Sequence, residues 1–194
     1  MAEQETHASE LAKALELEAE GQRRLLSGDE AGAAPFLRKA ADHYKRSWQL
    51  ASPTSYGRLI GMTKAAVLAG EGEEQGRFAR AELANVSEIT PAAAYALALG
   101  ALAVGDDEAA LPLVDTIALG GPPFARAAAA IGAICRSDRD ALEKVLAEIV
   151  ADFESRPAHL TGVPIADTAL MFARLAARRG LAVRLEGRAV GMAG

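Results

Sequence analysis

The chain has 194 residues, of which 51% are hydrophobic and only 5% aromatic, and its formal net charge is −5. This length allows one domain or one short array of repeats, and the acidic balance disfavours nonspecific binding of nucleic acid, which needs a basic face. The single cysteine, Cys135, excludes an intramolecular disulfide and a zinc site built from several cysteines.

The apolar residues are mostly Ala and Leu, which favour helix, and turn signals divide the first half of the chain into five predicted helices. One apolar stripe at helical spacing contains Phe36, Ala40, Tyr44 and Trp48. Ser52-Pro53 and Thr90-Pro91 each place a capping hydroxyl before a proline, which predicts that a helix starts there. The five predicted helices span residues 8–27, 31–50, 53–69, 73–85 and 91–104.

The second half of the chain predicts four more helices and an irregular tail. Gly120-Gly121-Pro122-Pro123 is the strongest break in the sequence, and Asp138 is the predicted N-cap of a later helix. Arg178-Arg179-Gly180 is typical of a helix C-terminus, since basic side chains complement the helix dipole and Gly forms a left-handed cap. The four predicted helices span residues 107–119, the segment from the Gly120–Pro123 break to residue 136, residues 139–155 and residues 164–179. Residues 181–185 are expected to form an irregular segment packed on the last helices.

The sequence offers no targeting or membrane segment. Residues 1–9 are polar and acidic, so no signal peptide is predicted. The most apolar stretch, residues 91–104, is too short to span a bilayer. We therefore expect a cytoplasmic protein without membrane contact.

Two segments of the chain match each other closely. In each segment a Gly-Asp pair is followed by an Ala five residues after the glycine and by a Pro seven residues after it. A small residue, Gly21 or Ala98, also stands seven residues before the glycine. The matched residues are Gly28, Asp29, Ala33 and Pro35 in the first segment and Gly105, Asp106, Ala110 and Pro112 in the second.

This pattern resembles the tetratricopeptide repeat, in which paired helices touch at small residues and are joined at Gly-Asp. Weaker units lie at Arg136, with Ala129 and Ala141, and around Gly70, with Thr63 and Gln75 at the small positions. The resemblance implies an all-α fold of about nine helices, stacked as antiparallel hairpins in a short right-handed solenoid. Residues 8–155 would form the array and residues 156–194 a capping helix and tail. Pro35 and Pro112 should each start or kink the second helix of their hairpin.

The same resemblance implies a function in protein–protein interaction. In this family the first helices of the hairpins line a concave groove that holds a peptide or helix of a partner. The candidate binding residues are Tyr56, Arg58, Lys64 and Tyr95, with Arg58 and Lys64 engaging carboxylates. We expect a non-enzymatic scaffold that has no catalytic residue, cofactor or metal. It would bind a protein or peptide but no nucleic acid, and it could also form a homodimer.

Two other functions remain open at this stage. One is an immunity or regulatory protein that neutralises a single partner, which the sequence does not separate from a scaffold. The other is an RNA-acting enzyme, because Arg38 and His43 have the spacing of the Arg-x4–6-His motif of HEPN-type proteins, with His as acid or base. Lys39 stands where that motif usually has Asn or Asp, and a solvated helix face is the simpler interpretation.

Two further groups of residues receive structural interpretations. Cys135 lies in an apolar run and is expected to act as a small buried hydrophobe. Arg174, Arg178 and Arg179 form a basic patch near the chain end, together with Arg184 and Arg188. We expect them to cap the last helix, and contact with an acidic partner or a second copy is the alternative.

Overall fold

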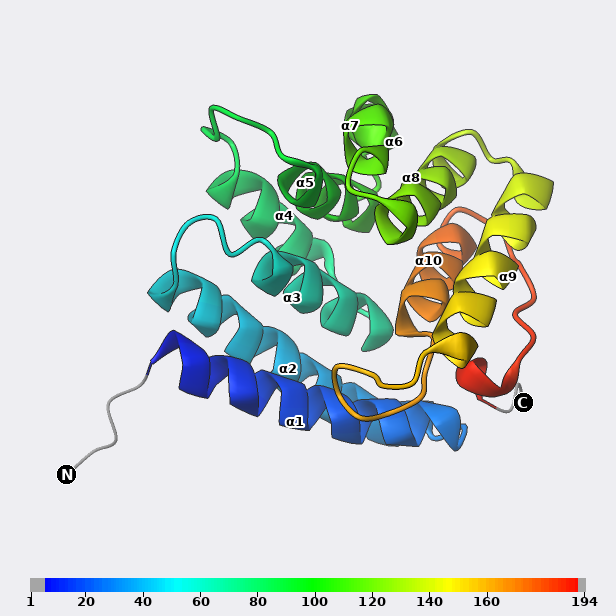
Figure 1. The fold of residues 1–194 in the computed structure, drawn as a ribbon, viewed down its shortest axis with the longest axis horizontal. Coiled ribbons are helices and arrows are strands. Elements are labelled where there is room, and N and C mark those ends of the chain that lie inside the picture. Colours follow the sequence, from blue (N-terminus) through cyan, green and yellow to red (C-terminus); the bar gives the residue numbers. More distant parts are fainter. Residues whose placement is uncertain (1–5, 192–194) are drawn as a thin grey trace.

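The computed structural model describes residues 6–191, which form helices and connecting loops without any strand (Figure 1). The predicted all-α fold class is therefore confirmed. Residues 1–5, part of the segment in which no signal peptide was predicted, lie outside the described residues. The α-helices are α1 (His7–Leu26), α2 (Glu30–Leu50), α3 (Gly57–Leu68), α4 (Glu73–Glu82), α5 (Pro91–Ala103), α6 (Asp107–Ala110), α7 (Val114–Ala118), α8 (Pro122–Cys135), α9 (Arg139–Ser155) and α10 (Asp167–Ala177). Two short 3-10 helices, η1 (Leu111–Leu113) and η2 (Arg188–Val190), complete the set.

Helices that follow one another along the chain pack against one another. Contacts join α1 to α2, α3 to α4, α4 to α5, and α8 to α9, so neighbouring helices form hairpins. The last helix breaks this order, because α10 returns to pack on α3, α8 and α9 (Figure 1). A segment near the chain end thus lies beside a helix from the first third of the sequence.

The two matched Gly-Asp pairs form the same turn. Gly28 and Gly105 have φ angles of +79° and +81°, a left-handed conformation that favours glycine. The amides of Asp29 and Asp106 donate to the carbonyls of Arg24 and Ala101 at 2.9 Å in both cases. This is the Schellman pattern, which satisfies carbonyls left unpaired at a helix C-terminus.

The pattern recurs at the two weaker units. Glu71 donates its amide to the Ala66 carbonyl, and Asp138 to the Ala133 carbonyl, each at 2.9 Å. The turn residue of the later unit is Ser137, with φ +53°, rather than the Arg136 that the sequence comparison suggested. Asp138 is the N-cap of α9, as predicted, and accepts a hydrogen bond from the Ala141 amide at 3.1 Å.

Two predicted helix starts are wrong. α3 begins at Gly57 rather than Pro53, because residues 51–55 form turns in which the Ser52 hydroxyl lies 3.1 Å from that of Thr54 instead of capping a helix. α10 begins at Asp167 rather than Pro164, because Ala166 has a non-helical ψ angle of 60°. The Ala166 amide donates to the Ala189 carbonyl, so a contact with the tail accompanies this boundary.

The two hairpin prolines behave differently. Pro112 lies in η1, between α6 and α7, so the helix predicted over 107–119 is interrupted where the proline was expected to act. Pro35 stays inside a continuous α2, and the prediction that a helix would start there is wrong. Both Pro35 and Ala31, whose carbonyl loses its usual amide donor, are exposed, so water can bond that carbonyl.

α4 and α5 cross at two glycines, Gly76 and Gly100. A Cβ on Gly76 would lie 2.6 Å from the Gly100 carbonyl oxygen, which is a backbone atom that cannot swing away. We expect Gly76→Ala to lower the free energy of unfolding by about 1–3 kcal/mol, as overpacked sites do, measured by urea unfolding. Gly57→Ala is the control, because nothing lies within 4 Å of its Cβ position; equal effects at both sites would contradict this helix crossing.

Candidate functional site

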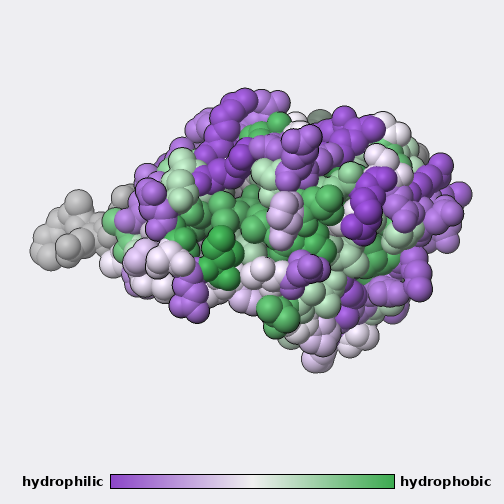
Figure 2. Space-filling model, turned by 90° about the horizontal axis from the view of Figure 1, so that it is seen from above, coloured by the Kyte–Doolittle hydropathy of each residue, from purple (hydrophilic) through white to green (hydrophobic). Residues whose placement is uncertain are grey.

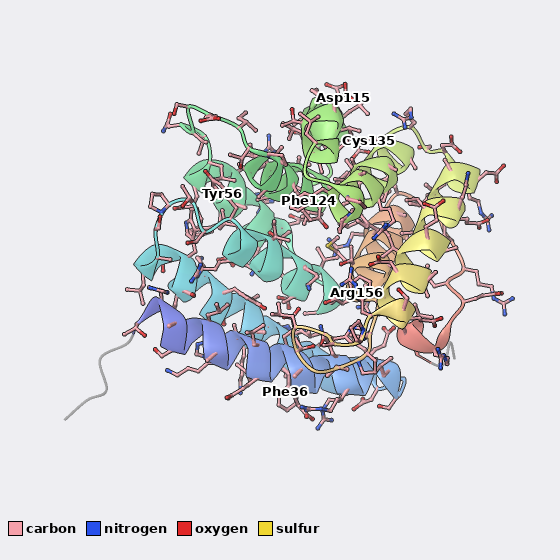
Figure 3. The ribbon with its side chains drawn as sticks, viewed as in Figure 1. Phe36, Tyr56, Asp115, Phe124, Cys135 and Arg156 are labelled. Carbon is pink, nitrogen blue, oxygen red and sulfur yellow. The ribbon has the colours of Figure 1, made fainter. Side chains whose placement is uncertain are left out.

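The four residues that the sequence proposed for partner binding all contact other parts of this chain. Tyr56, just before α3, is buried, with its ring centroid 6.2 Å from that of Trp48 (Figure 3). Arg58 donates from Nε to the Ser47 hydroxyl at 2.7 Å. Lys64 and Tyr95 lie deeper and both face α10. The structure therefore brings two of the four together and leaves the other two near the start of α3.

Lys64 is the centre of a buried ionic network. Its Nζ lies 2.5 Å from Asp167 Oδ2, at the first turn of α10, and 3.2 Å from Glu18 Oε1 of α1. The side chains of Lys64, Glu18 and Asp167 are 17%, 1% and 8% exposed. Gln22, also on α1, donates from Nε2 to Asp167 Oδ2 at 2.9 Å. One ammonium group thus joins α1, α3 and α10.

Two further groups complete this network. The Tyr44 hydroxyl donates to Glu18 Oε2 at 2.6 Å, which adds α2. The Thr161 hydroxyl donates to Gln22 Oε1 and so ties the loop of residues 156–166 to α1. Glu18 Oε1 accepts no hydrogen bond from the described residues, although the Lys64 ammonium is nearby. Two buried carboxylates therefore share one cation.

The charge state of Lys64 follows from its surroundings. Burial favours the neutral amine, but the nearby carboxylates of Asp167 and Glu18 oppose this effect and raise the pKa of Lys64 well above its ordinary value. The ammonium is therefore protonated near neutral pH, and a protonated amine is no nucleophile. The network can hold helices together or bind a charged group, and Lys64 is not an activated nucleophile.

Tyr95 supplies an aromatic contact on the other side of the Lys64 network. Its ring packs edge-on against Phe124 of α8 at 5.8 Å between centroids and lies 6.5 Å from Phe172 of α10. Burial raises the pKa of its hydroxyl, which stays protonated. Phe172 is fully buried, so α10 brings both a carboxylate and an aromatic ring to the face formed by α3, α5 and α8.

The arginines of the basic patch of α10 form hydrogen bonds with other parts of the same chain. Arg174 donates to the Leu68 carbonyl at 2.7 Å, and Arg179 to the Leu102 carbonyl at 2.8 Å. These carbonyls belong to the C-terminal turns of α3 and α5, and the Leu102 carbonyl also accepts from the Gly105 amide at 3.2 Å. Arg179 also makes a forked contact with Asp107, from Nε to Oδ1 at 2.9 Å and to Oδ2 at 3.0 Å. Arg178 donates to the Glu71 carbonyl.

Two pockets border α10. One, of about 690 Å³, lies between the turn at Gly70 and the C-terminus of α5, beside Arg178 and Arg179. The other, of about 920 Å³, lies between the turn at Gly28, α10 and residues 182–185. One pocket therefore lies beyond the C-terminus of α10 and the other along its outer side, at Leu170, Ala173 and Arg174. On the side that carries α6 and α7, hydrophobic residues form a band bordered by hydrophilic ones (Figure 2).

A second ionic cluster lies at the start of α1. The buried carboxylate of Glu10 lies 2.7 Å from His43 Nδ1 and 3.0 Å from Lys13 Nζ. Arg38, the other half of the proposed RNA-acting motif, pairs instead with Glu71. His43 and Arg38 therefore engage different carboxylates, on α1 and on the α3–α4 turn.

We expect Glu10→Gln to reduce the acid sensitivity of the fold. The hydrogen bond with His43 lowers the pKa of Glu10, so its contribution to stability is present above the ordinary carboxyl pKa and is lost as the pH falls through the lowered folded value. Urea unfolding from about pH 6 to about pH 3 should therefore show a smaller decline for Glu10→Gln than for the parent. Parallel declines would contradict the assignment, and Glu16→Gln, at an exposed position of α1, is the matched control.

The sequence reasoning missed the carboxylates that hold Lys64. Glu18 and Gln22 lie at helical spacing in line with Leu11, Leu15 and Leu25, and polar residues within an apolar stripe indicate a buried polar contact. Cys135 was expected to be buried, but it is only half-buried at the end of α8 (Figure 3), and this burial raises the pKa of its thiol.

Comparison with protein-family models, curated proteins and solved structures finds no match to this chain. Within residues 6–191, no helix has both the length and the apolar character that a bilayer span requires. The same residues contain no group of three or more His, Cys, Asp or Glu side chains arranged to hold a metal ion.

Proposed function

We propose that this chain is a non-enzymatic interaction module, a tetratricopeptide-like array of hairpins whose inner face binds an amphipathic helix of a partner protein. Here the inner face means the surface of α3, α5 and α8 on which α10 packs. The observation that carries the proposal is α10 itself, a helix from the far end of the chain that occupies this face and shields Lys64 and Tyr95.

The packing of α10 supports this role. Met171, Phe172, Leu175 and Ala176 are fully buried, while Ala177 on the opposite side is exposed. α10 therefore lays one apolar side on the surface of other helices, an arrangement also used in peptide recognition, while Leu170 and Ala173 on its other side are partly buried. The loop of residues 156–166 joins it to α9.

The recurrent turns support the array. Four Schellman turns, at Gly28, Gly70, Gly105 and Ser137, each join a helix to the next one. A hairpin that cannot cover its own apolar side packs on its neighbour, and arrays of this kind present extended binding surfaces. On this account α10 fills that surface from within the same chain.

A nicked form of the full chain tests the proposal. A specific protease site replaces residues 157–160, which are exposed except for the half-buried His159 and leave Thr161 intact. After cleavage we expect the fragment of residues 161–194 to stay bound without a covalent link. A fluorescein-labelled synthetic copy should then replace it, as followed by fluorescence anisotropy, while circular dichroism shows that the hairpins keep their helices.

The matched control is a cut in the α4–α5 loop, at residues 84–89, which are also largely exposed. That cut divides the array itself, so its fragments should separate only when the protein unfolds. The proposal is overturned if the labelled fragment fails to exchange, or if removing residues 161–194 unfolds the remaining helices.

A further inference from the structure

We propose that the inner face selects its helix by the charges at both ends of that helix. Lys64 and Gln22 recognise a carboxylate in the first turn. The C-terminal carbonyls of α3 and α5, together with the Asp107 carboxylate, recognise arginines at the other end. This inference rests on the proposed function. The partner it describes is an amphipathic helix with an acidic start and an arginine-rich end.

The acidic end is recognised inside the protein. Asp167 Oδ2 lies 2.5 Å from Lys64 Nζ and 2.9 Å from Gln22 Nε2, and the Asp167 side chain is only 8% exposed. A neutral residue at this position would lose the charge-assisted hydrogen bond, and a basic residue would add a cation beside a buried ammonium. An acid in the first turn also interacts favourably with the dipole of its own helix.

The arginines at the C-terminal end of α10 contact hydrogen-bond acceptors of the inner face. Arg179 reaches the Leu102 carbonyl and both oxygens of Asp107, and Arg174 reaches the Leu68 carbonyl. Two of these acceptors lie at helix C-termini, where the dipole is negative. The forked contact with Asp107 matches the planar guanidinium group, so lysine at position 179 should not replace arginine.

The two ends together fix the direction of the bound helix. Arg179 lies just beyond Ala177, the last residue of α10, which is about 15 Å along the helix from Asp167. The acidic end must lie beside α1 and α3, and the basic end beside the termini of α5 and α6. A helix with the same composition but reversed charges would place its arginines beside Lys64.

Competition in the nicked protein tests this charge pattern. Synthetic fragments of residues 161–194 carrying Asp167→Asn, Asp167→Lys, Arg179→Lys or Arg179→Gln compete with the labelled parent fragment. We expect each to bind more weakly, by about tenfold for the neutral changes and by more for Asp167→Lys, since charge-assisted hydrogen bonds are lost. Ala177→Gln, at the exposed side of α10, should bind like the parent.

A double-mutant cycle separates recognition from a general loss of helix. In hairpins that carry Asp107→Asn, the difference in affinity between the parent fragment and the Arg179→Gln fragment should shrink, because the forked partner is already weakened. The circular dichroism of each free fragment provides a check on helix content.

The outcomes of this competition are distinct from those of the first experiment. If Phe172→Ala weakens the fragment but all charge variants bind like the parent, the charge pattern is overturned while the interaction module stands. If no fragment exchanges at all, the proposed function itself fails.

Discussion

Replacing Lys64 with methionine is expected to lower the free energy of unfolding by about 3–5 kcal/mol, the cost of breaking a buried ion pair from one side. Methionine keeps much of the side-chain volume but leaves Glu18 and Asp167 buried without their shared cation. Urea unfolding followed by circular dichroism measures the change.

Lys45→Met is the matched control for this substitution. Lys45 pairs with Glu74 at 3.3 Å, but the Glu74 side chain is 77% exposed, so solvent screens the pair and its loss should cost less than about 1 kcal/mol. Adding Asp167→Asn to Lys64→Met should recover part of the stability, because one uncompensated carboxylate is removed. Equal effects of Lys64→Met and Lys45→Met would show that the buried network does not stabilise the fold.

Phe172→Ala is expected to lower the free energy of unfolding by about 3–5 kcal/mol, as large-to-small changes at buried aromatic positions do. Phe172 is fully buried on α10 and packs near the Tyr95 ring. The substitution removes the largest apolar contact between α10 and the inner face, so the region near α10 should loosen first. Thermal unfolding and urea unfolding both measure the total change.

Phe36→Ala provides the comparison. Phe36 is half-buried on α2, and its main contact is the Arg24 guanidinium, 4.9 Å from the ring centroid. Such an exposed cation–π contact contributes about 0.5–1 kcal/mol. If the two alanine substitutions cost the same, Phe172 would not be the central apolar contact of α10.

Local signals in the sequence predicted most of the helices and several of their ends. Gly28, Gly105 and Gly180 mark C-terminal caps because few other residues adopt their positive φ angles. Thr90 and Asp138 were predicted as caps and accept hydrogen bonds from amides three residues later. These features depend on neighbouring residues only, so a single sequence contains the information.

The features that sequence reasoning missed depend on distant contacts. Asp167 begins α10 where the tail bonds to the preceding residue, and nothing local distinguishes it from the predicted start at Pro164. The partners of Lys64 come from α1 and α10, which are far apart along the chain. The sequence identified Lys64 as a candidate to engage carboxylates, and the carboxylates that it engages here belong to its own chain.

The repeat pattern likewise includes features that the sequence predicts and features that it does not. The Gly-Asp turns were visible in the sequence, and Ala33 and Ala110 are fully buried as that pattern implies. The position of α10 on the inner face was not visible, because packing of a terminal helix depends on the whole surface.

If α10 is a helix bound by its own chain, it can leave the inner face while the hairpins stay folded. Native-state hydrogen exchange of the intact protein tests this most directly, because it measures the free energy of opening helix by helix. We expect amides of α10 to exchange through a partial opening of lower free energy than those of α1, α2 and α3. Asp167→Asn should lower this opening free energy for α10 alone. Exchange of α10 only through global unfolding, with the same free energy as α1 to α3, would contradict it.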